Sequence, residues 1–132
     1  MFTDSRGVCP AGWHLPTPAE WTTLATFLTD NGYGYEGSGP DIGKSLAATA
    51  EWTADATPGN VGNDPATNNS SDYAAYPGGS RSAAGSLTKA GTAAFWWTSA
   101  TGSFRALNNN SAELASDTTS NKNALSVRCI KD

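Results

Sequence analysis

The sequence is poor in the residues that metal binding and acid–base catalysis most often use. Its 132 residues include one histidine and two cysteines. The cysteines, Cys9 and Cys129, stand at opposite ends of the chain, whereas a structural zinc site needs four ligands in close pairs. The sequence therefore argues against a zinc site, and no second histidine is present to share a metal or a proton relay.

Charged residues and long apolar runs are scarce as well. Lys and Arg number 8 and Asp and Glu 12, so the net charge of −4 gives no electrostatic reason to expect nucleic acid or an anionic membrane as a partner. No apolar run approaches the roughly 20 residues that span a bilayer, so direct membrane insertion is not expected. The opening MFTDSRG lacks the pattern of a signal peptide, although a fragment of a larger surface protein would look the same.

Aromatic and small polar residues are what the sequence does contain. Its 5 Trp, 4 Tyr and 4 Phe must supply most of the large apolar area, so we expect an aromatic core that includes Trp13 and Trp21. The abundance of Gly, Ser, Thr, Asn and Ala favours a loop-rich domain over a helical bundle. The length suits one domain, covering residues 1–132.

The two cysteines have two interpretations. A disulfide between Cys9 and Cys129 would close a loop of nearly the whole chain, and in the chain-entropy model it would stabilise the fold by roughly 4 to 5 kcal/mol. Such a bond would imply an oxidising, extracytoplasmic setting. The alternative is a pair of buried free thiols, because sequence alone does not fix the pairing. We favour the disulfide.

Two helices are predicted in the first half of the chain. Thr17, Pro18 and Glu20 form a helix start, with Thr17 as the N-cap, Pro18 at the first helical position and Glu20 closing a capping box. The apolar spacing that follows predicts a helix over residues 18–30. A second, shorter helix is predicted over residues 41–48, with Asp41 as its cap.

Short strands are predicted in the second half, after a long turn-rich loop over residues 54–71. The predicted strands cover residues 73–76, 94–99, 104–107, 112–115 and 125–130. In the last of them, we expect Leu125, Val127 and Cys129 to share one face. Helices followed by short antiparallel strands and irregular loops indicate an α+β fold.

Consecutive residues in a strand point to opposite faces, which bears on the pair Trp96 and Trp97. We therefore expect only one of them in the core, and the other facing a covering loop or solvent. Trp97 is the one retained as a candidate ligand contact.

The only histidine, His14, lies in an apolar, proline-bounded turn. General acid–base catalysis needs a neighbour that sets the pKa of the catalytic group, and the nearby Glu20 is already explained by the capping box. We therefore interpret His14, and the whole segment CPAGWHLPTPAEW around it, as structural rather than catalytic.

The loop segment NVGNDPATNN offers oxygen atoms of the type that calcium prefers. Its candidate ligands are Asn60, Asn63, Asp64 and Asn69. Only one of these is a carboxylate, so a solvated loop is favoured over a calcium site, and no other cofactor is expected.

Four blocks of the sequence resemble one family. CPAGWHLPTPAEW at 9–21, ATNNSSDYAAYPGG at 66–79, FWWTSA at 95–100 and SVRCIKD at 126–132 occur in family order. Together they resemble the Fibrobacter succinogenes major paralogous domain. The resemblance implies a C-type-lectin-like fold with adjacent termini, related to the formylglycine-generating sulfatase-modifying domains.

The resemblance also implies a surface protein of bacteria or their phages, of which this chain would be the C-terminal ligand-binding domain. Some members with this fold are variable proteins of diversity-generating retroelements, which diversify the stretch just before a tail like SVRCIKD. Here that stretch lies between Ser99 and Ala124, and the expected partner is a protein or carbohydrate on another cell or surface. The expected ligand-binding residues are Trp97, Ser103, Arg105, Asn109, Asn110, Glu113, Asp117, Thr118, Asn121 and Asn123.

Two other hypotheses remain open. An enzyme of the formylglycine-generating type would need a reactive cysteine, and a disulfide would leave it none. An inert spacer of a larger surface protein would use its polar loops only for solvation.

Overall fold

The computed structural model describes residues 7–132. The opening Met1–Arg6, part of the segment expected not to be a signal peptide, lies outside the described residues. Two α-helices, α1 (Pro18–Asp30) and α2 (Gly43–Leu46), precede most of the strands. The strands are β1 (Trp13–His14), β2 (Ser80–Arg81), β3 (Leu87–Thr88), β4 (Ala93–Trp97), β5 (Ser103–Asn108), β6 (Ala115–Thr118) and β7 (Ile130–Lys131). The predicted α+β class, with two helices and short antiparallel strands, is confirmed.

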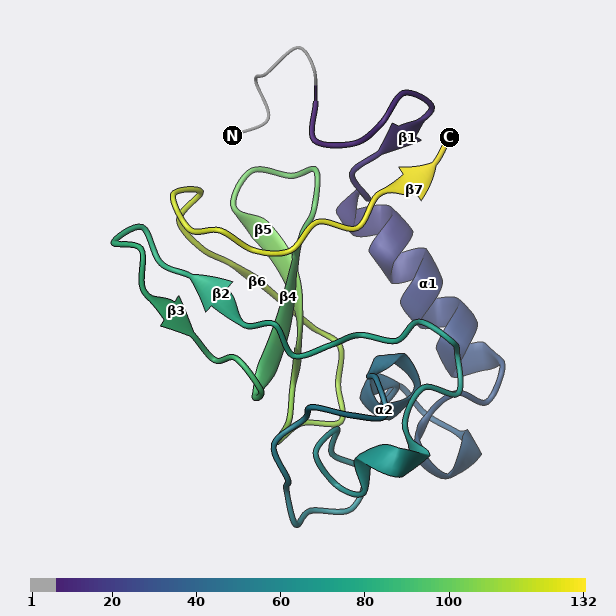
Figure 1. Cartoon of the computed structure of the whole chain (residues 1–132). Helices are drawn as coiled ribbons and strands as arrows, with labels where there is room; N and C mark the ends of the chain where they lie inside the picture. The colour runs from purple at the N-terminus through teal and green to yellow at the C-terminus, as the bar shows by residue number, and fades with distance from the viewer. Residues whose placement is uncertain (1–6) are drawn as a thin grey trace.

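The strands form three small antiparallel sheets. The largest has the order β4-β5-β6, and β2 pairs with β3 as a separate hairpin. The third sheet joins the two ends of the described chain, because β1 pairs with β7 and places His14 opposite Ile130. Figure 1 shows these two strands side by side at one end of α1. The prediction that the ends of the chain lie together is confirmed.

Helix α1 forms where the sequence predicts it. The Glu20 backbone N–H donates to the Thr17 hydroxyl at 3.1 Å, and the Thr17 backbone N–H donates to the Glu20 carboxylate at 2.8 Å. Both arms of the capping box are therefore present. The helix buries Trp21 and Leu28 against the core.

Helix α2 is shorter than predicted, and its expected cap is wrong. Ile42 occupies the N-cap position without a side-chain bond, and the Asp41 carboxylate instead accepts from the backbone N–H of Tyr35. The helix ends at Leu46 because Ala47 turns to extended backbone and bridges Ala75. Tertiary contacts, rather than local capping, set its bounds.

Two of the five predicted strands are confirmed. Those over 94–99 and 104–107 correspond to β4 and β5, whose two ends each differ from the predicted bounds by at most two residues. The strand predicted over 112–115 is displaced, since β6 begins at Ala115. Residues 73–76 form no strand, because Ala74 has a positive φ of 55° and only Ala75 makes a bridge.

The strand predicted over 125–130 is also wrong. Only Ile130 belongs to a strand, β7, and Val127 is 36 % exposed, so the expected inward face does not exist. The strands that sequence analysis missed, β1, β2 and β3, have two residues each and are too short to show a periodic pattern.

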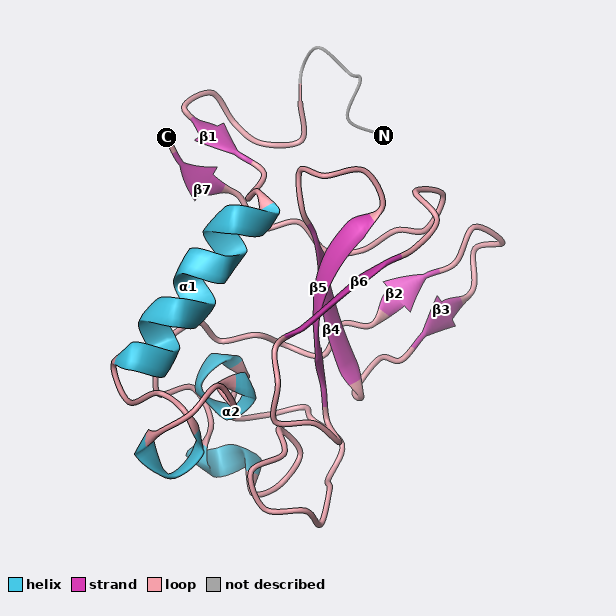
Figure 2. Cartoon of the chain, turned by 180° about the vertical axis from the view of Figure 1, so that it is seen from behind, coloured by secondary structure: helices cyan, strands magenta, loops and turns pink. Residues whose placement is uncertain are grey.

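Hydrophobic clusters cover both faces of the central sheet. On the α1 side, Trp96 packs against Trp21 with ring centroids 5.8 Å apart, and its other neighbour is Tyr73. On the opposite face, Phe95 packs edge-on against Phe104 at 5.7 Å. Figure 2 shows α1 on one side of the sheet and the β2-β3 hairpin on the other.

The tryptophans depart from the prediction in two ways. Trp96 and Trp97 are both buried, at 6 % and 2 % exposed, so the second tryptophan does not face solvent, one of the two places expected for it, and Trp97 is wrong as a surface ligand contact. Ser126 pairs with β4 at this point, where the Trp97 backbone N–H donates to the Ser126 carbonyl. Trp13, expected in the core, is 46 % exposed in β1.

The long loop predicted over 54–71 is confirmed except for one 3-10 turn at Pro65–Thr67. It is tied firmly to the core. Val61 is fully buried, and the buried Asn68 amide donates to the carbonyls of Ala48 and Val61. None of the helices in the described part of the chain combines the length and the hydrophobicity needed to cross a membrane.

Candidate functional site

The ten residues predicted to bind a ligand are not brought together. Trp97 is buried and therefore unavailable at the surface. Ser103 and Thr118 are neighbours, because their strands pair at one end of the sheet. Asn109 and Asn110 follow β5 at its other end, about 20 Å away for a six-residue strand. The predicted face is thus divided between the two ends of the central sheet.

Two of the predicted residues have structural partners. The Asn109 amide donates to the Thr53 carbonyl at 3.2 Å, which fastens the β5-β6 connection to the long loop. The Asn123 side chain accepts from the backbone N–H of Ala83 and donates to Thr119, which fastens its turn to the β2-β3 hairpin. The other polar candidates that are exposed to solvent are Asn110, Glu113, Asp117, Thr118 and Asn121.

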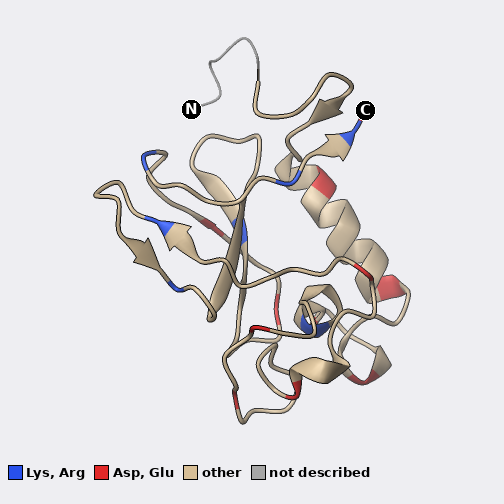
Figure 3. Cartoon of the chain, in the orientation of Figure 1, with Lys and Arg blue, Asp and Glu red and all other residues tan. Residues whose placement is uncertain are grey.

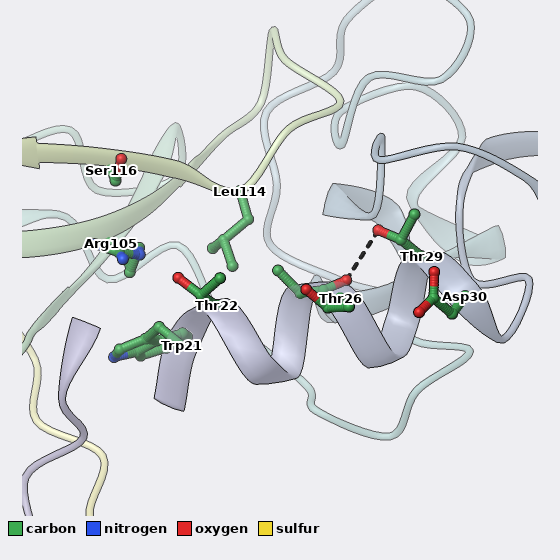
Figure 4. Close-up of a pocket in the computed structure, with 9 residues that line it drawn as sticks. Trp21, Thr22, Thr26, Thr29, Asp30, Arg105, Leu114 and Ser116 are labelled. Carbon is green, nitrogen blue, oxygen red and sulfur yellow. Dashed lines mark hydrogen bonds between the residues drawn. The ribbon is translucent and has the colours of Figure 1, made fainter. Parts of the chain in front are cut away.

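Arg105 lines a groove beside the central sheet. A cavity of about 310 Å³ runs between α1 and the edge strand β6, and Figure 4 shows the residues that line it. Its walls are Trp21, Thr22, Ala25, Thr26, Thr29 and Asp30 from α1, with Arg105, Leu114 and Ser116 from the sheet side. We call this cavity the α1-β6 groove.

Sequence analysis found Arg105 but missed the helical wall of the groove. Thr22, Thr26 and Thr29 are spaced four and three residues apart, which places them on one face of the helix. This polar stripe runs beside the apolar stripe that predicted the helix. The spacing of these three threonines is the sequence signal that indicates a polar wall on this side of the helix.

The position of Arg105 follows from strand pairing. It lies on the central strand β5, directly opposite Ser116 of β6, so both side chains share the face that looks toward α1. The guanidinium donates to the Pro18 carbonyl at 3.2 Å and to the Phe104 carbonyl at 3.4 Å. Partial burial lowers the pKa of Arg105 through desolvation.

The Arg105 guanidinium has no ionic partner within residues 7–132. The ion pairs in that part of the chain involve His14, and none involves Arg105. A guanidinium carries five N–H donors, and backbone carbonyls take two of them here. The groove therefore contains a positively charged group with donors to spare.

His14 is held between two carboxylates. Its Nδ1 lies 2.6 Å from the Asp132 carboxylate, and its Nε2 lies 2.9 Å from Glu20. We call these three residues the terminal clasp, because they join the first turn of α1 to the end of the chain. The expectation that His14 lacks a neighbour that sets its pKa is wrong.

Both carboxylates act on the pKa of His14. The hydrogen bond with Asp132 and then that with Glu20 raise it above the usual value. The pKa of Glu20 is lowered, first by the backbone hydrogen bond from Thr17 and then by His14. With both ring nitrogens engaged, His14 has the geometry of a structural link, which agrees with its structural interpretation.

Cys9 and Cys129 form a disulfide, with their Cα atoms 5.8 Å apart and a sequence separation of 120. The chain has no other cysteine. The predicted disulfide is therefore present, and no thiol remains.

The four candidate calcium ligands do not converge. The amides of Asn60 and Asn63 both bond to Asp55, and Asn69 accepts from a backbone N–H. The Lys44 ammonium donates to the backbone carbonyls of Asn63 and Asp64, so a cation already occupies this turn. Across residues 7–132, no group of three or more His, Cys, Asp or Glu side chains is placed to hold a metal ion.

Comparison with known proteins gave one match. The family model described as the Fibrobacter succinogenes major domain matches residues 1–131. No curated protein and no solved structure matched the chain.

Proposed function

The chain belongs to the Fibrobacter succinogenes major domain family, and from that premise we propose that it is a non-catalytic ligand-binding module. The observation that carries the proposal is the α1-β6 groove, where the Arg105 guanidinium faces hydroxyl side chains without an ionic partner in the described chain. Buried or half-buried charges are normally paired, so an unpaired one in a groove favours a ligand that pairs with it.

The binding surface in this proposal is smaller than the one expected from sequence. It combines the α1-β6 groove with the exposed Thr118, which lies on the same face of β6 as Ser116, whereas Asp117 pairs with Phe104 on the opposite face. Arg105, Ser116 and Thr118 lie within the diversified stretch that the resemblance implies between 99 and 124. Asn109 and Asn123 act mainly in holding their loops.

The wider setting is part of the same proposal. A C-type-lectin-like fold is supported by the pairing of β1 with β7, which brings the ends of the chain together. An extracytoplasmic place, on a cell surface or a phage particle, is supported by the disulfide. In this setting the ligand is a protein or carbohydrate of another surface, and the domain belongs to a larger protein of the variable, receptor-like type.

Neither other hypothesis has comparable support. A formylglycine-generating type of chemistry needs a reactive thiol, and both cysteines are in the disulfide. An inert spacer accounts for the Asn residues of the loops and for the bond from Arg105 to the Pro18 carbonyl, but it gives no role to the guanidinium donors that remain.

The proposal is tested by displaying the purified domain to arrays of glycans and of surface proteins. We expect at least one ligand to bind the wild-type domain, and Arg105→Gln to weaken that binding about tenfold or more, because a charge-assisted hydrogen bond is lost. Arg81→Gln is the matched control, since Arg81 lies in the separate β2-β3 sheet and its side chain donates, within residues 7–132, to the nearby Gly85 carbonyl.

Two results would contradict this function. One is a domain that binds nothing on either array, which favours the spacer. The other is a ligand whose affinity is unchanged by Arg105→Gln and by Ser116→Ala, which moves the binding surface elsewhere.

A further inference from the structure

The α1-β6 groove differs chemically from one end to the other. Arg105 stands at one end, and Asp30, in the last turn of α1, stands at the other (Figure 4). Between them lie hydroxyl side chains of the helix and of Ser116. A ligand that fits this order carries a negative group at one end and hydroxyl donors at the other.

Two of the hydroxyls between the charged ends, those of Thr22 and Thr29, are oriented to accept. Thr22 donates its proton to the Pro18 carbonyl at 3.0 Å, and Thr29 donates its proton to the Ala25 carbonyl at 2.9 Å. Each oxygen therefore keeps its lone pairs for an outside donor. Asp30, a carboxylate, also only accepts. This wall of the groove matches a ligand rich in O–H groups.

The charge of the surrounding chain favours an anion at the Arg105 end. Residues 80–132 contain six Lys or Arg and three Asp or Glu, whereas residues 7–79 contain one Lys and eight Asp or Glu. Figure 3 shows the acidic residues concentrated around α2 and the neighbouring loops, with most basic residues in the sheets and the last segment. Because oppositely charged surfaces attract over several ångströms, this division orients an anionic ligand toward the sheet.

The apolar lining and the volume of the groove limit the shape and the size of the ligand. Leu114 and Ala25 supply an apolar floor, on which the carbon face of a ring can rest. A cavity of about 310 Å³ lies at the small end of the range for ligand pockets, which suits a single ring rather than an extended chain.

We propose that the α1-β6 groove binds a sugar acid through its carboxylate, with Arg105 as the carboxylate-binding residue and the threonine and Asp30 oxygens accepting from the sugar hydroxyls. This inference rests on the proposed ligand-binding function and names the ligand class of that site. Arg suits the role because its planar fork binds a carboxylate through two parallel hydrogen bonds, which Lys cannot do.

An amino acid or acidic peptide fits the groove less well. The three donors of its ammonium group sit on one nitrogen, whereas Thr22 and Thr29 are seven residues, or about two helical turns, apart on α1, so one of the accepting hydroxyls is left without a donor. A ring with several hydroxyls meets the whole row.

The test is an NMR titration of the isotope-labelled domain with glucuronate, glucose, acetate and glutamate. We expect glucuronate to bind with an affinity of about millimolar, as suits one small ring, and to shift the amides of Arg105, Ser116 and Thr26. Glucose and acetate each match only half of the groove, so we expect each to bind at least about tenfold more weakly. Raising the salt concentration should weaken glucuronate binding, because the carboxylate contact is ionic.

Variants of Arg105 distinguish a loss of glucuronate recognition from a loss of folding. Arg105→Gln should abolish detectable glucuronate binding, and Arg105→Lys should restore only part of it, because the charge returns without the fork. Arg81→Gln should bind as the wild type does. The amide spectrum of each variant shows whether it is folded, and the Lys variant keeps the test valid if the Gln variant does not fold.

Three outcomes would overturn the inference. Glucose binding as tightly as glucuronate removes the role of the carboxylate, and glutamate binding more tightly replaces the sugar acid with an amino acid. Amide shifts confined to residues outside the groove would show that the sugar acid binds elsewhere on the domain. In each case a ligand found on the arrays still supports the proposed function, whereas failure on both arrays as well as in the titration removes both.

Discussion

At the scale of single residues, His14 shows how a side chain without a catalytic role can still carry a pH dependence. The terminal clasp satisfies both of its ring nitrogens with carboxylates that come from opposite ends of the chain. Both carboxylates favour the protonated imidazole, and Glu20 also closes the capping box through its second oxygen. The clasp is therefore an electrostatic link whose strength depends on the charge of all three groups.

The pH dependence of stability should reflect the clasp. The pKa of His14 is raised in the folded state, so its contribution is complete below the unfolded value, near 6.5, and is lost as the pH rises through the folded pKa. The pKa of Glu20 is lowered, so its contribution is complete above the unfolded value, near 4.3, and is lost as the pH falls through the folded pKa. We expect the clasp to be strongest between about pH 4.5 and 6.5.

Melting curves followed by circular dichroism between pH 4 and 9 test this expectation. In His14→Gln, the fall in Tm between mildly acidic and alkaline pH should become shallower than in the wild type. Glu20→Gln is an informative partner, because Gln keeps the capping box while removing the charge. An unchanged pH profile in both variants would show that other groups carry the dependence.

The tryptophans mark the limit of prediction at this scale. Trp21 was placed correctly in the core because the helical period identifies its face. Trp96 and Trp97 could be assigned to opposite faces, but the burial of both could not be predicted, because period-2 alternation does not show that both faces of the sheet are covered. Trp13 was misplaced for the converse reason, since β1 pairs at the edge of the molecule, where one side of the strand faces solvent.

At the scale of elements, local signals predicted α1 to the residue, and tertiary contacts determined α2. Thr17 and Glu20 close the cap of α1 with their own side chains, so the sequence contains all that its start requires. Helix α2 has no such cap. Its first residue, Gly43, donates its backbone N–H to the Ala112 carbonyl at 2.7 Å, a contact with a segment nearly seventy residues away.

Gly43→Ala should reverse the usual effect of this substitution in a helix. Alanine in place of glycine normally stabilises a helix by about 0.5 to 1 kcal/mol. Here a Cβ would lie 2.7 Å from the Ala112 carbonyl oxygen and 3.1 Å from Val61, so the backbone must move. We expect a loss of about 1 to 3 kcal/mol in the free energy of unfolding, as overpacking typically costs.

Urea unfolding of the variant measures this loss. Thr23→Ala on the exposed face of α1 is the control, because its hydroxyl bonds only within the helix and alanine is the better helix former. That control should be neutral or slightly stabilising. A Gly43→Ala variant as stable as the wild type would mean that the contact with Ala112 relaxes at no cost.

At the scale of the whole molecule, the fold surrounds its central sheet with segments that are distant in sequence. Helix α1 covers one face, and the β2-β3 hairpin with residues 124–126 lies over the other (Figure 2). Single-sequence periodicity cannot show such coverage, which is why the short strands were missed and why the expected ligand contacts fall at both ends of the sheet. The adjacency of the chain ends could be predicted, because the cysteine positions carry that information directly.

The disulfide, the β1-β7 pairing and the terminal clasp all hold the same two segments together. Of the three, the disulfide acts mainly on the unfolded chain, where it closes a loop of 120 residues. The other two act only in the folded state, and they keep the ends in place when the covalent bond is absent. Loss of the disulfide should therefore lower stability without changing the folded geometry.

Replacing both cysteines with serine tests this division of roles. The chain-entropy model gives a loss of roughly 4 to 5 kcal/mol, and even about 2 kcal/mol would lower the Tm by roughly 6 to 12 °C for a domain of this size. Binding in the α1-β6 groove at low temperature should persist, because Arg105 and the helical wall do not contact either cysteine.

The double variant avoids a free thiol that could link two molecules. Wild-type protein treated with a reductant should melt at the same lowered temperature. A variant that keeps its Tm would mean that the native disulfide is strained by as much as loop closure contributes, whereas a variant that loses groove binding while still folded would mean that the chain ends position α1.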